Sequence, residues 1–152
     1  MWISRKSLRK RVLNEPVYLD SNVFILPLIH GDSGRGAHAV RLLRKVEAGE
    51  TTAYTSILTW DEVTWVVLKT LGRADSLQAG KKLLQFPNLR FVDVSEAVVT
   101  RCQWLMEKYQ IKPRDALHCS SAIMKGIKSM VSDDRDFDIV REIKRTPLER
   151  SV

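Results

Sequence analysis

The order of apolar and polar segments along the chain predicts strands that alternate with helices. Short apolar runs bounded by Pro, Gly or acidic residues predict four strands, at residues 17–19, 51–55, 90–94 and 129–132. Apolar positions three and four apart predict helices at residues 23–28, 37–46, 57–71, 74–85, 97–106 and 113–125. Pro27 is expected to kink or end the first of these helices. The alternation favours a single three-layer α/β/α domain around a mainly parallel sheet of four to five strands.

Carboxylates stand at or just beyond the ends of these predicted strands. Because parallel strands share one carboxyl edge, side chains far apart in sequence can converge there. The acids at such positions are Asp20, Asp61, Glu62, Asp115, Asp133, Asp134 and Asp136. Each has a local explanation as well, such as a helix cap at Asp20, a favourable helix dipole at Asp115 or a solvated acidic loop after the last strand. Periodicity alone does not choose between Asp61 and Glu62 as the acid that points inward.

Taken together, these acids point to a bound divalent cation. Several carboxylates held close together resist ionising, and a doubly charged ion relieves their repulsion. Oxygen ligands without His or Cys suit Mg²⁺ or Mn²⁺ rather than zinc. Such an ion can activate water and neutralise charge that develops on a phosphate, so the pattern favours phosphodiester hydrolysis.

Charge and composition add a basic N-terminal extension and exclude several protein classes. The chain has 152 residues and a net charge of +7, a size typical of one domain. Five of the basic residues precede the first acid, namely Arg5, Lys6, Arg9, Lys10 and Arg11. We therefore divide the chain into a basic extension at residues 1–15, which either binds nucleic acid or is simply solvated, and a domain at residues 16–152.

The remaining composition is that of a cytoplasmic protein. No apolar run approaches the roughly 18 residues of a membrane span, and no secretory signal follows the basic segment. Cys102 and Cys119 are far apart and form neither a C-x-x-C motif nor a disulfide framework. A reducing cytoplasm and no membrane association are expected.

Four short segments around these acids form a recognisable set. In chain order they are Tyr18-Leu19-Asp20-Ser21-Asn22, Ser56-Ile57-Leu58-Thr59-Trp60-Asp61-Glu62-Val63, Arg114-Asp115-Ala116-Leu117-His118 and Val131-Ser132-Asp133-Asp134-Arg135-Asp136-Phe137. In this order and spacing they resemble the four motifs of the PIN-domain ribonucleases. In size the chain is most similar to the single-domain VapC-type toxins of toxin–antitoxin modules, especially archaeal ones.

The resemblance implies a PIN-like fold and a metal-dependent endoribonuclease. The resemblance favours Glu62 over Asp61 as the acid of the second motif, because the family places that acid six residues after a Ser at the end of a strand, here Ser56. It implies Asp20, Glu62, Asp115 and Asp134 as catalytic ligands of Mg²⁺ or Mn²⁺, with Asp136 as an alternate or auxiliary catalytic acid. The side chains expected to orient ligands or water are Asn22, Ser56 and Ser132. A metal-activated water would cleave RNA to leave a 5′-phosphate and a 3′-hydroxyl. The family also implies a homodimer and a small antitoxin partner.

Other polar residues near the motifs have weaker assignments. Arg114 and Arg135 flank the acids and are candidates for phosphate contact, because guanidinium groups bind phosphate in a two-pronged way. His118, one turn after Asp115, is interpreted as a buried, hydrogen-bonded histidine, with a general-base role as the alternative. Trp60, Trp65 and Trp104 are expected in the core or an interface rather than as base-stacking platforms.

Three other functions remain open at this point. The chain could be a PIN nuclease of RNA maturation or quality control that has no antitoxin. It could also be a non-catalytic nucleic-acid-binding module that binds RNA through residues 5–11. A haloacid-dehalogenase-like phosphatase is disfavoured, because its motif needs a second Asp two residues after the first, where this chain has Asn22.

Overall fold

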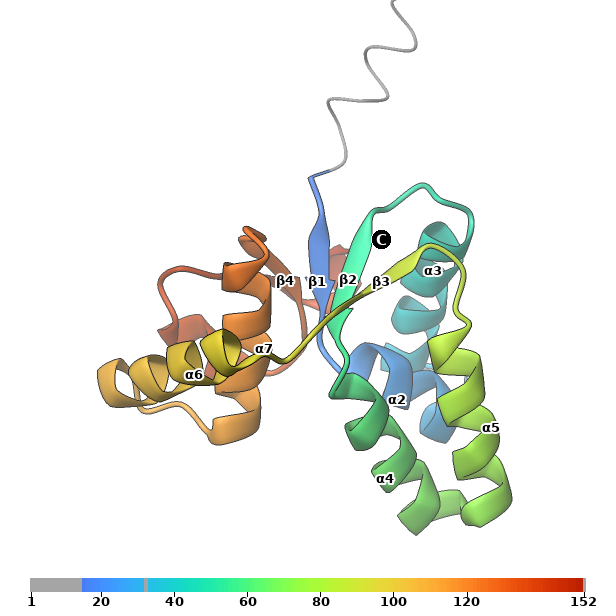
Figure 1. Cartoon of the computed structure of the whole chain (residues 1–152). Helices are drawn as coiled ribbons and strands as arrows, with labels where there is room; N and C mark the ends of the chain where they lie inside the picture. Colours follow the sequence, from blue (N-terminus) through green and yellow to red (C-terminus); the bar gives the residue numbers. More distant parts are fainter. Residues whose placement is uncertain (1–14, 32, 152) are drawn as a thin grey trace, which may run out of the picture.

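The computed structural model describes residues 15–31 and 33–151, which form a five-stranded parallel sheet between two layers of helices (Figure 1). The strand order is β3-β2-β1-β4-β5, and every neighbouring pair is parallel. The strands are β1 (Val17–Leu19), β2 (Ala53–Ser56), β3 (Leu89–Val92), β4 (Ser129–Val131) and β5 (Lys144–Thr146). This confirms the three-layer α/β fold expected from the alternation of elements.

Paired helices connect the strands and cover both faces of the sheet. The helices are α2 (Asn22–His30), α3 (Arg35–Glu47), α4 (Thr59–Leu71), α5 (Arg73–Leu84), α6 (Glu96–Lys108) and α7 (Pro113–Met124). Helices α2 to α5 pack on one face, and α6 and α7 on the other, as the two sides of Figure 1 show. Two short 3-10 helices, η1 (Arg135–Ile139) and η2 (Leu148–Arg150), lie on either side of β5.

Strand β1 separates two hydrophobic cores. Its side chains alternate between the faces, so Leu19 packs in the core beneath α2 to α5 and Tyr18 in the core beneath α6 and α7. Both side chains are fully buried. A strand covered on both faces needs apolar residues at consecutive positions, which explains the uninterrupted run at Val17–Leu19.

Two elements of this fold extend beyond what the sequence pattern marks. Pro27 does not end its helix, because α2 continues to His30 and the N–H of Gly31 still donates to the Pro27 carbonyl at 3.0 Å. Val23, Phe24, Ile25 and Leu26 are all buried, and their packing offsets the one backbone hydrogen bond that Pro27 cannot make. The fifth strand, β5, was not located in the sequence, because Lys144-Arg145-Thr146 is a polar edge strand without an apolar pattern.

The strand order places a topological switch point between β1 and β4. The connection from β1 to β2 passes over one face of the sheet, and the connection from β3 to β4 passes over the other. The direction in which successive strands are added to the sheet therefore reverses beside β1. Ligand sites of α/β proteins lie at such switch points. The register pairs Leu19 with Val131, which brings the next residues of the two strands, Asp20 and Ser132, together at this edge.

Within the described ranges, no helix has both the length and the apolar character needed to cross a lipid bilayer.

Candidate active site

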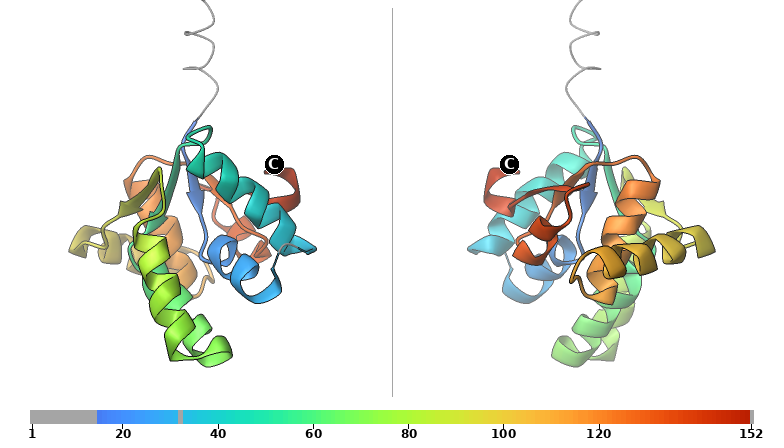
Figure 2. Two further views of the ribbon diagram at one scale, coloured as in Figure 1. Left: turned by 90° about the vertical axis from the view of Figure 1, so that its right-hand side faces the viewer. Right: turned by 90° about the vertical axis from the view of Figure 1, so that its left-hand side faces the viewer.

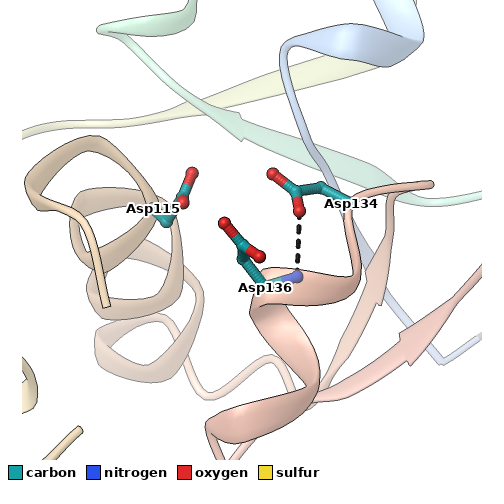
Figure 3. A group of neighbouring side chains, drawn as sticks. All are labelled: Asp115, Asp134 and Asp136. Carbon is teal, nitrogen blue, oxygen red and sulfur yellow. Dashed lines mark hydrogen bonds between the residues drawn. The ribbon is translucent and has the colours of Figure 1, made fainter. Parts of the chain in front are cut away.

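Three aspartates from two separate elements converge at the carboxyl edge of the sheet (Figure 3). Asp115 lies in the first turn of α7, whereas Asp134 and Asp136 belong to the segment that leaves β4. One carboxylate oxygen of each lies within 4.8 Å of the others. We call these three residues the acidic cluster.

Local hydrogen bonds hold the two aspartates that follow β4. Asp134 caps η1, because its Oδ1 accepts the N–H of Asp136 at 2.9 Å. The N–H of Asp134 in turn donates to Ser132 Oγ at 3.0 Å. Asp136 is more exposed and accepts a hydrogen bond from Lys112 Nζ at 2.9 Å. The turn after β4 therefore presents both carboxylates to α7.

Asp20 lies beside the cluster and is almost completely buried. Its Oδ2 accepts from Ser132 Oγ at 2.7 Å, and its Oδ1 accepts from the Ser21 N–H at 2.7 Å. Burial raises the pKa of Asp20, while the nearby His118 and the Ser132 hydroxyl act in the opposite direction. Burial makes ionisation of this carboxylate costly despite these hydrogen bonds, and a cation would offset that cost.

Glu62, and not its neighbour Asp61, faces this site from α4. Its Oε2 accepts from Ser21 Oγ at 3.0 Å and its Oε1 lies 2.6 Å from His118 Nε2. Burial alone raises the pKa of Glu62, but the hydrogen bond and charge of His118 outweigh it, so the pKa is lowered overall. Asp61 is exposed and lines an outer groove between α4 and α5. The structure thus resolves the choice that periodicity left open.

His118 is the buried histidine expected from the sequence, and its partners are the carboxylates of the site. Its side chain is 2% exposed, with Nε2 at 2.6 Å from Glu62 and 3.6 Å from Asp20 Oδ1. Its Nδ1 lies 2.7 Å from the hydroxyl of Tyr18, which also accepts the N–H of Ser56 at 2.9 Å. In the neutral imidazole the Tyr18 hydroxyl donates to Nδ1, so Nε2 carries the proton that faces Glu62.

The five predicted acids therefore form two adjoining groups. Asp115, Asp134 and Asp136 make the acidic cluster, while Asp20 and Glu62 are connected through Ser21 and His118. Ser132 joins the groups, because its hydroxyl donates to Asp20 and accepts from the backbone of Asp134. The negative charges also interact: burial, Asp134 and Asp20 together raise the pKa of Asp115 to about 6.

Comparison with known families identifies this arrangement. The family model of the PIN domain matches residues 17–143, which span β1 to the segment before β5. The chain belongs to the PIN domain family. No curated protein matches the chain.

Solved structures share the fold of this PIN domain at low sequence identity. A chain of VapBC from Salmonella typhimurium, bound to DNA, superposes with a TM-score of 0.70 at 15% identity and covers 88% of this chain and 98% of its own. A chain of VapBC2 from Rickettsia felis gives 0.69 at 16% identity, with the same coverage of 88% and 98%. VapC20 from Mycobacterium tuberculosis, a toxin that cleaves the sarcin-ricin loop, gives 0.65 at 20% identity and covers 80% and 92%. At these identities the likeness shows the fold alone.

The donor atoms of this PIN domain fit a hard divalent cation. The acidic cluster offers carboxylate oxygens from three residues, and Asp20 and Glu62 offer more beside it. No Cys or His belongs to the cluster, whose oxygen ligands match Mg²⁺ or Mn²⁺ better than zinc. The raised pKa of Asp115 indicates repulsion that a bound cation would relieve.

Three side chains were predicted to orient ligands or water, and only one of them contacts a carboxylate of the site. Ser132 orients Asp20, as expected. Ser56 Oγ accepts the N–H of Leu58 at 3.1 Å at the start of α4, so it orients the helix that carries Glu62 rather than a carboxylate. Asn22 is exposed at the first position of α2, and the structure shows no hydrogen bond from its side chain to another described residue. Ser21 was missed, although it follows Asp20 directly.

The structure also shows where the remaining acid of the last motif and the two arginines beside the acids lie. Asp133 points away from the cluster, where its Oδ1 accepts the Leu148 N–H at 2.9 Å, which leaves Asp134 and Asp136 as site residues. Arg114 is exposed near Glu62 and its charge lowers the pKa of that residue. Arg135 is exposed and lines a neighbouring cleft. The predicted nucleic-acid-binding residues Arg5, Lys6, Arg9, Lys10 and Arg11 lie outside the described residues.

The three tryptophans are not core residues. Trp60 and Trp65 on α4 and Trp104 on α6 are 42%, 47% and 40% exposed, so the structure corrects the core interpretation and leaves the interface one. Trp60 still packs along one edge, since a Cβ at Gly80 would lie 2.7 Å from its Nε1, whereas Lys69 lies over the ring of Trp65 and Arg101 and Lys108 over that of Trp104.

The raised pKa of Asp115 predicts a pH-dependent loss of stability in the metal-free protein. The pKa of Asp115 is about 6 in the folded protein, above the 3.8 of an unperturbed Asp. The folded state therefore binds the proton more tightly than the unfolded chain and loses stability as the pH rises through this range. Replacing Asp115 with Asn removes the carboxylate and with it this loss of stability at high pH. We expect a thermal midpoint about 2–4 °C above wild type at pH 7.5, the effect of about 1 kcal/mol, because solvent screens this half-buried group. Near pH 4 the gain should largely vanish; equal gains at both values would contradict this assignment.

Proposed function

We propose that this protein is a divalent-metal-dependent endoribonuclease and the toxin of a type II toxin–antitoxin module. The observation that carries the proposal is the convergence of Asp115, Asp134 and Asp136 beside the buried Asp20 at the switch point of a PIN domain. The acids come from α7, from the turn after β4 and from the end of β1, so the fold itself assembles them. A phosphodiester is a substrate that this concentration of negative charge would repel unless a cation were bound.

In this proposal Asp20, Glu62, Asp115 and Asp134 hold Mg²⁺ or Mn²⁺, with Asp136 as an auxiliary acid. When bound, the cation supplies an activated water and neutralises the charge that develops on the phosphate. The protein's own side chains fix the carboxylates: Ser132 and Ser21 orient Asp20, and His118 orients Glu62. Arg114, exposed near Glu62, is placed to contact a phosphate of the RNA. The products carry a 5′-phosphate and a 3′-hydroxyl.

The structural neighbours support both the substrate and a protein partner. One of them, VapC20, is a toxin that cleaves the sarcin-ricin loop. Others include a toxin–antitoxin complex from Klebsiella pneumoniae, FitAcB from Neisseria gonorrhoeae and FitAB bound to a DNA fragment. We infer a small antitoxin that occludes the acidic cluster, and a homodimer as the unit that it binds. The activity belongs in the cytoplasm, where the buried free thiols of Cys102 and Cys119 stay reduced.

Incubation of the purified protein with a structured RNA tests this function. We expect cleavage with Mg²⁺ or Mn²⁺, none with excess chelator, and 5′-phosphate ends when the fragments are mapped. Asp20→Asn should abolish cleavage and keep the fold, because the Asn is isosteric and removes a charge whose burial is unfavourable. Unchanged cleavage in Asp20→Asn, or cleavage that survives the chelator, would contradict the proposal.

A further inference from the structure

A basic cleft lies directly beside the candidate active site. It has a volume of about 790 Å³ and is enclosed by the N-terminal end of α3, η1, β5 and η2. Four arginines line it: Arg35, Arg135, Arg145 and Arg150. Figure 2 shows α3 and the C-terminal segment next to each other on this side of the molecule. The cleft therefore shares η1 with the acidic cluster, whereas α3, β5 and η2 contribute residues to the cleft alone.

The chain that follows β4 separates the cleft from the acidic cluster. Asp134 turns into the cluster, whereas Asp133 lines the cleft. Ser132 connects the two sides, because its carbonyl accepts from Arg145 at 3.0 Å and its hydroxyl donates to Asp20 at 2.7 Å. The basic cleft and the acidic cluster therefore meet at residues 132–134.

Most of the carboxylates in the cleft are already engaged by the protein. Asp138 accepts two hydrogen bonds from the Arg145 guanidinium, at 2.7 and 2.9 Å. Asp133 accepts the Leu148 N–H and lies 3.9 Å from Arg35. Among the described residues, Arg135 and Arg150 have no ion-pair partner. Arginines without a protein partner are free to bind an external anion.

A second cleft extends the basic surface along α3. It has a volume of about 490 Å³, shares His38 and Glu149 with the first, and adds Arg41, Arg44 and Lys45. Arg35, His38, Arg41 and Arg44 recur every three residues, so each lies beside the next on a stripe that turns gradually around the helix. Between residues 35 and 45 the helix rises about 15 Å along its axis. The two clefts together contain seven Arg and Lys side chains and three carboxylates.

We propose that this surface, from Arg135 and Arg150 along α3 to Lys45, binds the sugar–phosphate backbone of the RNA strand next to the cleavage site. The inference rests on the proposed function. A linear series of guanidinium groups that begins at the catalytic carboxylates matches a polyanion that passes through the site, and a positively charged groove that follows the backbone is the common device for single strands. Within residues 15–31 and 33–151, no Phe, Tyr or Trp lines either cleft, so the contacts that these residues offer are with phosphates and carry no base sequence.

The double variant Arg41→Gln/Arg44→Gln tests this surface away from the catalytic carboxylates. Its matched control is Arg73→Gln/Lys81→Gln, which removes the same charge from exposed positions of α5 that line neither cleft. Both are made in the Asp20→Asn background, so that a labelled 20-nucleotide single-stranded RNA is bound without being cleaved. Affinity is measured by fluorescence anisotropy between 50 and 300 mM salt.

We expect the α3 variant to bind RNA on the order of tenfold more weakly at 0.1 M salt, with a salt slope reduced by about 1.4, since each phosphate contact on a single strand contributes about 0.7. The control should stay within about twofold of the parent. Equal losses in both variants, or no loss in the α3 variant, would overturn the proposed surface. Cleavage is measured separately, in the protein that keeps Asp20. If that protein cleaves RNA but the α3 variant binds RNA with unaltered affinity, this surface alone is refuted. If the α3 variant binds more weakly but the protein with Asp20 does not cleave, the nuclease function alone is refuted.

Discussion

Replacing Glu62 with Gln is expected to lower metal-dependent RNA cleavage by more than about 100-fold, since even the residues behind a metal ligand typically contribute 10–100-fold. Gln has the same shape but lacks the charge that a cation requires. Its amide oxygen can still accept from His118 Nε2, and its NH2 group can donate to Ser21 Oγ, so the packing of α4 is preserved. The measurement is the initial rate of cleavage at fixed Mg²⁺, with circular dichroism to confirm the fold.

Asp61→Asn is the matched control, because it removes the same charge one residue earlier. Asp61 is exposed on the outer side of α4 and has no contact with the acidic cluster. We expect its rate to stay within about twofold of wild type, as surface substitutions away from special features have small effects. A large loss in Asp61→Asn, or a normal rate in Glu62→Gln, would show that α4 presents the other acid to the substrate.

His118 should control the reaction through Glu62, without contact with the RNA. His118→Ala removes the hydrogen bond at 2.6 Å and the charge that lower the pKa of Glu62. The pKa of Glu62 then rises, so the acidic limb of the rate profile should move to higher pH. We expect a rate loss of about 10–100-fold, the usual contribution of a group that orients a ligand. The readout is the pH dependence of cleavage between pH 5 and 8.

Tyr18→Phe separates this positioning role from a purely structural one. It keeps His118 and Glu62 but removes the hydroxyl that contacts Nδ1 at 2.7 Å and accepts the Ser56 N–H. Leaving such buried groups without a partner costs about 1–3 kcal/mol, so the thermal midpoint should fall. The acidic limb should shift less than in His118→Ala. If His118→Ala loses stability but keeps the wild-type pH profile, its role is structural only.

The positions of the acids could be predicted from the sequence because the signals are local. Asp20, Asp115 and Asp134 each follow a recognisable strand end or begin a helix, and parallel strands bring such ends together. Glu62 was harder, since Asp61 and Glu62 both have apolar neighbours at helical spacing. The periodicity left this choice open, the family resemblance favoured Glu62, and the packing of α4 against α2 shows Glu62 beside Ser21.

Other parts of the site depend on contacts that have no local signal. The hydrogen bond between Tyr18 and His118 joins residues 100 positions apart, and it forms because both side chains point into the core beneath α6 and α7. Strand β5 is polar and lies at the sheet edge, so no apolar pattern marks it. The basic cleft depends on this strand, because Arg145 of β5 holds both Asp138 and the Ser132 carbonyl.

Calorimetric titration of the metal-free protein with Mn²⁺ tests the central claim most directly, namely that the gathered carboxylates form a cation site. At pH 7.5 wild type should show saturable binding that weakens as the pH falls through about 6, where Asp115 takes up a proton. Asp115→Asn should lose this binding, while Asp61→Asn should keep it. Identical binding in wild type and Asp115→Asn, or no saturable binding in wild type, would contradict the account.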